Sequence, residues 1–145
     1  MNPEGTSVVT WTSRGQDDPN SSIGQGVFAQ RYNTAGFPRG REFQVNTTFV
    51  GEQFDPAAAM DVHGNFIIVW QGAGPTPDDG DGIYAQMFDA DGVPFGGQFR
   101  VNTTTAGSQS NPAIALDPDG NFIIAWVSED TPPPNFTVGI WARRF

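Results

Sequence analysis

The sequence predicts an all-β protein made of repeated four-stranded antiparallel meanders, arranged as β-propeller-like blades. Three observations support this fold class: a motif that returns at a fixed period, short apolar runs rich in β-branched and aromatic residues, and glycine-containing turns between those runs. No segment places apolar residues at the i, i+3, i+4, i+7 spacing of an amphipathic helix over a useful length.

The strongest signal is an internal repeat. The sequence at 26–32 returns at 82–88 and again at 139–145, which are offsets of 56 and 57 residues. The segment at 61–70 returns at 117–126 with the same offset of 56. The chain therefore holds about two and a half copies of one unit within a single module, 1–145, and the units are approximately 1–48 (partial), 49–104 and 105–145 (partial).

The first two strands of each unit differ in character. The first strand is expected at 56–61 and 112–117 and is rich in alanine, which suits a crowded position near a propeller axis. The second is expected at 65–71 and 121–127 as a continuous apolar run that contains a tryptophan. Such a run is too short for a helix and indicates a strand buried on both faces.

The last two strands are separated by a glycine turn. The third strand is expected to begin at the glycine before an aromatic residue and to end at the turns 33–36 and 89–92. The fourth, at 42–46 and 98–102, alternates apolar and polar residues. A stacked β-solenoid is the competing arrangement, and the tight hairpin turns favour propeller blades.

Composition excludes several partner classes. The chain has 145 residues, seven arginines with no lysine, and 16 acidic residues, for a net charge of -9. Since nucleic-acid affinity depends on neutralising phosphates, no nucleic-acid partner is expected. No apolar run is long enough for insertion into a membrane, and the absence of cysteine excludes disulfides and thiolate metal sites.

The repeated motifs resemble a known class of blades. Gly-Asn-Phe at 64–66 and 120–122, Gly-Ile-Tyr-Ala-Gln at 82–86 and Phe-x-Val-Asn-Thr at 43–47 and 99–103 are similar to blade repeats of large secreted bacterial proteins of the cell-surface and adhesin-like kind. The first three strands also look like NHL-type blades. The resemblance implies an extracellular, non-enzymatic scaffold for adhesion or recognition, without implying one ligand.

Partial blades predict association. Sheet edges and apolar faces backed by Val8, Ile67, Ile68, Ile123 and Ile124 would be left uncovered in a lone copy. We therefore expect the chain to bind itself, as a ring or a filament, or to pack against neighbouring repeats of a longer chain.

Three repeated tryptophans are candidate ligand-binding residues. Trp11, Trp70 and Trp126 end the apolar strands, where their rings would stack on glycans or, alternatively, pack between blades. Because the tryptophan recurs at equivalent positions, packing is the simpler interpretation.

Two further candidate sites lie in loops and turns. Asp78, Asp79 and Asp81 offer oxygen ligands for Ca²⁺, although their spacing is not that of an EF-hand, and no other cofactor is expected. Asn-x-Ser/Thr sequons, which are candidate glycosylation sites, occur at Asn20, Asn46, Asn102 and Asn135.

Catalytic motifs are scarce in the sequence. His63 is the sole histidine and occupies a turn position, so a Ser-His-Asp triad has little support. The strongly placed acidic residues belong to repeated turns, and the Asp-box of sialidases is missing. The sequence thus predicts a protein that is not an enzyme: an extracellular structural or adhesive repeat module that self-associates, with a glycan-binding, lectin-like propeller as the alternative.

Overall fold

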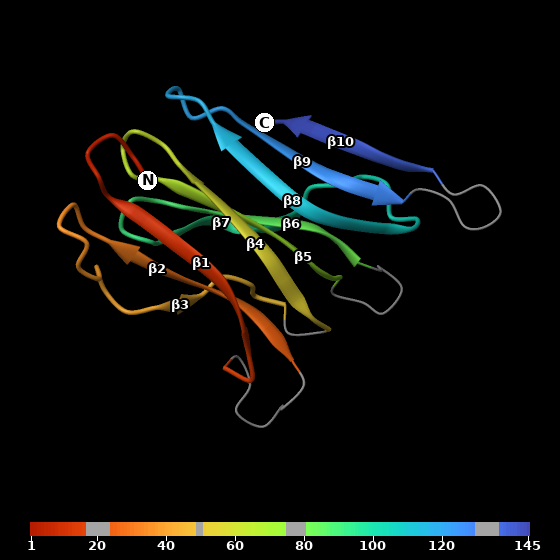
Figure 1. Ribbon diagram of the computed structural model, residues 1–145, viewed down its shortest axis with the longest axis horizontal. Coiled ribbons are helices and arrows are strands. Elements are labelled where there is room, and N and C mark those ends of the chain that lie inside the picture. Colours follow the sequence, from red (N-terminus) through yellow and green to blue (C-terminus); the bar gives the residue numbers. More distant parts are fainter. Residues whose placement is uncertain (17–23, 49–50, 75–80, 130–136) are drawn as a thin grey trace.

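The computed structural model describes residues 1–16, 24–48, 51–74, 81–129 and 137–145, and these residues form three antiparallel sheets (Figure 1). Blade 1 contains β1 (Ser7–Arg14), β2 (Gln25–Tyr32) and β3 (Phe43–Gln44) in the order β1-β2-β3. Blade 2 contains β4 (Gln53–Met60), β5 (Phe66–Ala73), β6 (Asp81–Phe88) and β7 (Pro94–Arg100) in that order. Blade 3 contains β8 (Ser108–Leu116), β9 (Phe122–Glu129) and β10 (Val138–Arg144) in the order β10-β9-β8. The predicted all-β fold class of repeated antiparallel meanders is confirmed.

The strand registers match from blade to blade. One cross-strand pair recurs in all three sheets, and its members are Val9 with Gln30, Ile68 with Gln86, and Ile124 with Arg143. Residues aligned by the sequence repeat therefore occupy the same place in each sheet, so environments can be compared position by position. The described residues include no helix long and apolar enough to cross a membrane.

The first strand of a blade begins earlier than the sequence predicts. β4 starts at Gln53 and β8 at Ser108, whereas the predicted strands start at 56 and 112. Each strand contains a β-bulge at its proline. The residue before the proline, Asp55 (φ 51°) in β4 and Asn111 (φ 54°) in β8, adopts a left-handed backbone conformation. Asp and Asn tolerate that conformation better than most residues, and the extra residue lets the strand continue past a position that lacks an N–H.

The fourth strand ends where an asparagine side chain replaces the backbone ladder. Asn46 Oδ1 accepts a hydrogen bond from the Val27 N–H (2.9 Å), and Asn46 Nδ2 donates to the Thr48 carbonyl (2.8 Å). Asn102 bonds in the same way to the Ile83 N–H and the Thr104 carbonyl. β3 is consequently reduced to Phe43–Gln44 and β7 stops at Arg100, short of the predicted ends at 46 and 102.

An aspartate closes the turn between the first and second strands. Asp117 Oδ1 accepts hydrogen bonds from the N–H groups of Asp119 (3.0 Å) and Asn121 (2.9 Å), and its Oδ2 accepts one from Asn121 Nδ2 (2.8 Å). Asp61 makes the same three bonds in blade 2. The reversal uses Gly120 at φ 86°, a conformation that other residues rarely adopt.

The apolar core lies in two layers between the blades. Layer 1 lies between blades 1 and 2 and contains Val27, Ala29, Val45, Phe66, Ile68, Trp70, Tyr84 and Phe88. Layer 2 lies between blades 2 and 3 and contains Ile67, Val69, Ile83, Ala85, Val101, Phe122, Ile124 and Trp126. Fully burying one such large side chain contributes about 1.5–3 kcal/mol to folding. Face-to-face packing of blades is therefore the main source of stability.

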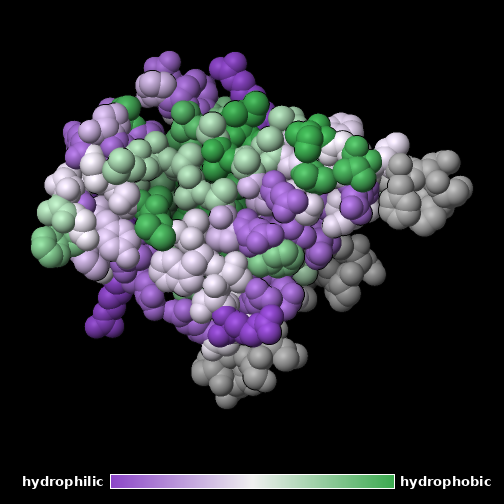
Figure 2. Space-filling model, in the orientation of Figure 1, coloured by the Kyte–Doolittle hydropathy of each residue, from purple (hydrophilic) through white to green (hydrophobic). Residues whose placement is uncertain are grey.

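The middle blade is covered on both faces and the end blades on one. The prediction of a second strand buried on both faces is confirmed for β5, which is buried along almost its whole length. It is wrong for β9, in which buried residues alternate with exposed or partly buried ones because only one face of blade 3 is covered. Figure 1 shows β4 running between β1 and β8, so blade 2 is held between its neighbours. In Figure 2, hydrophobic residues gather on the surface over the part of the molecule formed by β8, β9 and β10. Exposed large hydrophobic residues thus occur on the end blades, at Val9, Ile123 and Ile140, and also on blade 2, at Val93 and Phe95.

Candidate functional site: two equivalent grooves between blades

Two repeat-equivalent grooves lie at the turn end of the blade junctions. The first groove, between blades 1 and 2, has a volume of about 90 Å³. The second groove, between blades 2 and 3, has a volume of about 340 Å³. The walls come from matching positions, because the first groove is lined by Arg31, Tyr32, Arg39, Met60 and Gly64 where the second is lined by Met87, Phe88, Phe95, Leu116 and Gly120.

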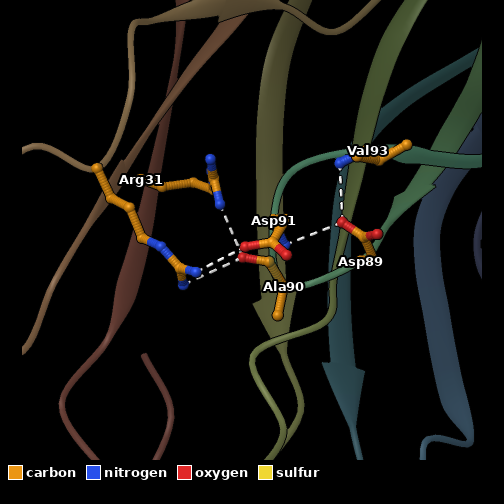
Figure 3. Close-up of polar contacts among 6 residues, drawn as sticks. Arg31, Asp89, Ala90, Asp91 and Val93 are labelled. Atoms are coloured by element: carbon orange, nitrogen blue, oxygen red, sulfur yellow. Dashed lines mark hydrogen bonds and ion pairs between the residues drawn. The ribbon is translucent and has the colours of Figure 1, made fainter.

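A turn from blade 2 narrows the first groove. Arg31 Nη1 donates a hydrogen bond to the Ala90 carbonyl (2.7 Å), and Arg39 Nη2 forms an ion pair with Asp91 Oδ1 (2.6 Å). Figure 3 shows this contact between the end of β2 and the turn that joins β6 to β7. Asp89 holds the turn by accepting hydrogen bonds from the N–H groups of Asp91 (2.9 Å) and Val93 (2.8 Å). The arginines thus clamp a preformed turn.

Burial and neighbouring charges both shift the pKa of Arg31, one of the two arginines of this clamp. Desolvation lowers the pKa of the Arg31 guanidinium, and the positive charge of Arg39 lowers it further, while Asp91 and Asp89 act in the opposite direction. Arginine keeps its proton at any ordinary pH, so Arg31 remains a cation and a hydrogen-bond donor.

The second groove has apolar walls instead. Met87 stands where the first groove has Arg31, and Phe95 stands where it has Arg39. Among the described residues, no segment of blade 3 corresponds to the clamped turn, since β10 is the last strand. Within the described residues, Phe95 is 70% exposed and the groove is open.

Phe95 is the exposed aromatic wall of the second groove, and polar groups stand at its rim. Phe66, Phe88 and Phe122 also line the groove, but they are only 1%, 3% and 9% exposed, and the stacked rings of Phe66 and Phe88 belong to layer 1. The rim carries the carboxylates of Asp61 and Asp89, together with Asn65 and other turn residues. Apolar faces flanked by a few fixed hydrogen-bonding groups are typical of small-ligand sites, and the volume is at the lower end of the range of about 300–1,000 Å³ seen for such sites.

One rim carboxylate retains acceptor capacity toward a ligand. Asp61 is 8% exposed and uses both oxygens to hold its own turn, whereas Asp89 is exposed and uses Oδ1 for two backbone N–H groups. An ionised carboxylate offers about four lone-pair sites, so the Asp89 side chain can still accept a hydroxyl donor from a ligand. The turn hydrogen bonds fix the orientation in which it would do so.

The three predicted ligand-binding tryptophans lie outside both grooves. Trp70 is fully buried in layer 1, where its Nε1 donates to Gln53 Oε1 (2.9 Å) and its ring packs on Tyr84. Trp126 is buried in layer 2. Trp11 is half-buried on the face of blade 1 that no other blade covers. The structure therefore places the first two at packing positions, where a sugar has no access to the ring.

Of the three predicted Ca²⁺ ligands, the structure describes one. Asp81 is exposed at the start of β6, and Asp78 and Asp79 lie outside the described residues. Within the part of the chain that the structure describes, no group of three metal-ligating side chains occurs.

The buried sequons count against glycans at two positions. Asn46 and Asn102 are 2% and 4% exposed, and their Nδ2 atoms already donate to backbone carbonyls, which argues against glycans there on the folded chain. Asn20 and Asn135 lie outside the described residues, and glycosylation remains a prediction.

Sequence reasoning missed Met87 and Phe95. The signal was present as two substitutions within the repeat, where arginine at 31 and 39 becomes methionine at 87 and phenylalanine at 95. The effect of these two substitutions becomes clear only in the structure, where positions 31 and 39 line the first groove and positions 87 and 95 line the second.

Comparison with known proteins shows the fold. No protein-family model and no curated protein sequence matches the chain. Among solved structures, an endo-arabinase from Bacteroides thetaiotaomicron is similar over 97% of this chain and 52% of its own, with a TM-score of 0.54 and 12% identity. A thermostable family-43 glycoside hydrolase is similar over 97% of this chain and 51% of its own, with a TM-score of 0.53 and 11% identity. The chain thus spans about half the length of these β-propeller enzymes and shares their fold.

These similarities correct the prediction of a non-enzymatic protein. The exclusion of catalysis rests on acidic residues that lie in repeated turns and on repeats that resemble those of non-enzymatic scaffolds, yet the two similar structures are an endo-arabinase and a family-43 glycoside hydrolase. The exclusion therefore fails. The likeness supports propeller-type blades, and it carries no specific support for NHL-type or adhesin-like repeats.

Proposed function

We propose that this chain is a glycan-binding β-propeller module whose binding site is the second groove. One observation carries the proposal: an open groove of about 340 Å³ whose apolar walls include the exposed ring of Phe95 and whose rim carries carboxylate and amide groups. A sugar ring has apolar C–H faces and hydroxyl edges, so it can pack on the exposed ring of Phe95 while its hydroxyls donate to the exposed carboxylate of Asp89.

The fold supports the same ligand class. The similar structures, an endo-arabinase and a family-43 glycoside hydrolase, act on glycans, and this chain matches about half of each. A fold hosts many functions, so the groove and not the fold gives the residues to test. Linear arabino-oligosaccharides are the natural first probe, followed by a glycan array.

The decisive variant is Phe95→Ala, because Phe95 is the exposed wall of the second groove. Phe37→Ala is the matched control, since Phe37 is 67% exposed and lines neither groove. Calorimetric titration should show binding by the wild type and by Phe37→Ala, and at least a tenfold weaker affinity for Phe95→Ala. Release of reducing sugar from the same probe should be measured in parallel, because it would extend the proposal from binding to cleavage.

Two results would contradict the proposal. A glycan array and arabino-oligosaccharides that both give no binding at millimolar ligand would remove glycans as the ligand class. Equal affinity of the wild type and Phe95→Ala would place any binding elsewhere on the chain.

A structural or adhesive assembly module is the second candidate function. It is favoured by the apolar faces that the end blades leave exposed, including Ile140 at 76% and Val9 at 50% exposure. An extracellular or cell-surface location belongs to this candidate and stays a prediction. Secretion of the chain by its natural host, detected by immunoblotting of culture medium and surface fractions, would support it, and retention inside the cell would contradict it.

A further inference from the structure

The two end blades expose different faces of one repeated interface. We call the leading face the side of a blade that packs on the next blade in the chain, and the trailing face the opposite side. The leading face of blade 3 exposes Ile123 (46%) and Ile140 (76%). The trailing face of blade 1 exposes Val9 (50%), with Trp11 half-buried beside it.

The internal junctions show what each kind of face binds. In layer 1, the leading face of blade 1 contributes Val8, Val27 and Ala29, and the trailing face of blade 2 contributes Phe66, Ile68 and Trp70. Layer 2 repeats the arrangement, with Ile67, Ile83 and Ala85 packed against Phe122, Ile124 and Trp126. A leading face of β-branched and small residues therefore meets a trailing face of bulky ones at both junctions.

The exposed residues occupy these same positions. Ile140 aligns with Ile83, which is 0% exposed, and Ile123 aligns with Ile67, which is 5% exposed. The equivalents on the trailing face are Val9 for Ile68 and Trp11 for Trp70. The exposed faces of blades 1 and 3 thus correspond to the two sides of an interface that occurs twice within the chain, between blades 1 and 2 and between blades 2 and 3.

A hydrogen-bond donor and an acceptor also lie at matching positions beside these two exposed faces. Arg144 aligns with Arg31, whose guanidinium donates to the Ala90 carbonyl of the next blade. Ala90 aligns with Thr34 of blade 1, in a turn that Asn33 holds by accepting the N–H groups of Ala35 and Phe37 (both 3.0 Å). Arg144 is exposed at the end of β10.

We infer that a second copy of this chain docks head to tail, with the leading face of blade 3 on the trailing face of blade 1 and Arg144 donating to the Thr34 carbonyl of that copy. Continuity with the internal junctions supplies the geometry, and the two faces are self-complementary by repeat. Since the chain matches 52% and 51% of the two similar propellers, two copies provide the length of one such propeller. Two identical head-to-tail contacts would close the pair.

The contact that we infer between copies involves the outer faces of blades 1 and 3, whereas the proposed glycan site is the groove between blades 2 and 3. A chain that does not dimerise would leave the glycan site uncontradicted, and a chain that binds no glycan would leave the contact between copies uncontradicted. Sedimentation velocity reports the first and calorimetric titration the second, so the two failures can be told apart.

The first experiment breaks one face at a time in the full chain. Wild type should sediment as a dimer at micromolar concentration, and Ile140→Glu and Val9→Glu should each raise the dissociation constant at least tenfold. Val93→Glu is the control, because Val93 is 57% exposed on the β6–β7 turn of the middle blade. Its dimer should be unchanged. All three variants replace exposed residues, so circular dichroism should show intact folding.

Mixing the variants tests the head-to-tail arrangement itself. Ile140→Glu keeps an intact trailing face and Val9→Glu an intact leading face, so an equimolar mixture should form dimers that neither variant forms alone. A symmetric contact between two copies of β10 would instead lose its dimer with Ile140→Glu only, and mixing would restore nothing. That pattern, or a wild-type chain that remains monomeric at 100-fold higher concentration, would overturn the inference.

Discussion

The two blade junctions share a fold and differ in chemistry. Both bury a layer of matched apolar residues, and both carry a groove at the same end. The first groove is narrowed to about 90 Å³ by the arginine clamp, whereas the second keeps about 340 Å³ behind Met87 and Phe95. The difference teaches that the apolar layer is the conserved requirement of the repeat within this chain, while the groove positions are free to change.

A second lesson concerns exposure. Isoleucines at equivalent positions are fully buried in blade 2 and largely exposed in blade 3, as Ile83 at 0% and Ile140 at 76% show. The residue type at each position is set by the sequence repeat, whereas the exposure of that residue depends on how many blades pack against its own blade. Apolar residues at repeat positions on the end faces are the basis of the contact that we infer between two copies of the chain.

The largest expected effect comes from breaking layer 1. Ile68→Asp places a charge at a fully buried position, which costs several kcal/mol against a total stability of about 5–15 kcal/mol. The variant should be unfolded or melt at a much lower temperature, as measured by circular dichroism. Val9→Asp is the repeat-matched control, and because Val9 is half exposed it should retain a cooperative transition. Wild-type-like melting of Ile68→Asp would show that the layer does not hold the fold.

A smaller effect comes from converting one groove into the other. Arg31→Met removes the hydrogen bond to the Ala90 carbonyl, and for a partly exposed pair we expect a loss of about 1 kcal/mol in the free energy of unfolding. Urea denaturation measures this change.

The reciprocal variant sharpens the same comparison. Met87→Arg adds an arginine at a groove that has no clamped turn among the described residues, so its unfolding free energy should change by less than about 0.5 kcal/mol. Equal destabilisation by the two substitutions would show that the clamp is irrelevant to the difference between the junctions.

The smallest expected effect is on the pH dependence of stability. The hydrogen bond from the Asn121 side chain lowers the pKa of Asp117 below its ordinary value. A folded pKa below the unfolded one stabilises the folded state above about pH 3.9, and this stabilisation is lost as the pH falls through the folded pKa.

Asp117→Asn should therefore lose more stability relative to wild type at pH 6 than at pH values below the folded pKa. Urea titrations across this pH range measure the change. Asp119→Asn removes a carboxyl from the same turn, in which only the Asp119 N–H takes part, and serves as the charge-matched control. A difference between wild type and Asp117→Asn that stays constant with pH would contradict the assignment.

Much of the fold was predictable because the repeat reports it directly. The period fixed which strands correspond, and the continuous apolar run at 65–71 predicted the doubly buried β5. The ends of strands were less predictable, since the bulge at Asp55 and the side-chain bonds of Asn46 depend on neighbouring strands. Such contacts are made in three dimensions and leave only a weak trace in local sequence.

The site was less predictable than the fold. The repeated tryptophans attracted attention because they recur, yet recurrence reflected packing for Trp70 and Trp126. The candidate groove instead lies where the repeat is broken, at Met87 and Phe95. A position that departs from the repeat is visible in the sequence, and its meaning depends on which junction it faces.

The most direct test of the central claim is an amide NMR titration of the wild-type chain with a linear arabino-oligosaccharide. The account predicts saturable shift changes that cluster at Met87, Phe95 and the turn at 117–121, with none at Arg31 and Arg39. No shift changes at millimolar ligand, or equal changes at both grooves, would contradict the claim that the open second groove is the glycan site.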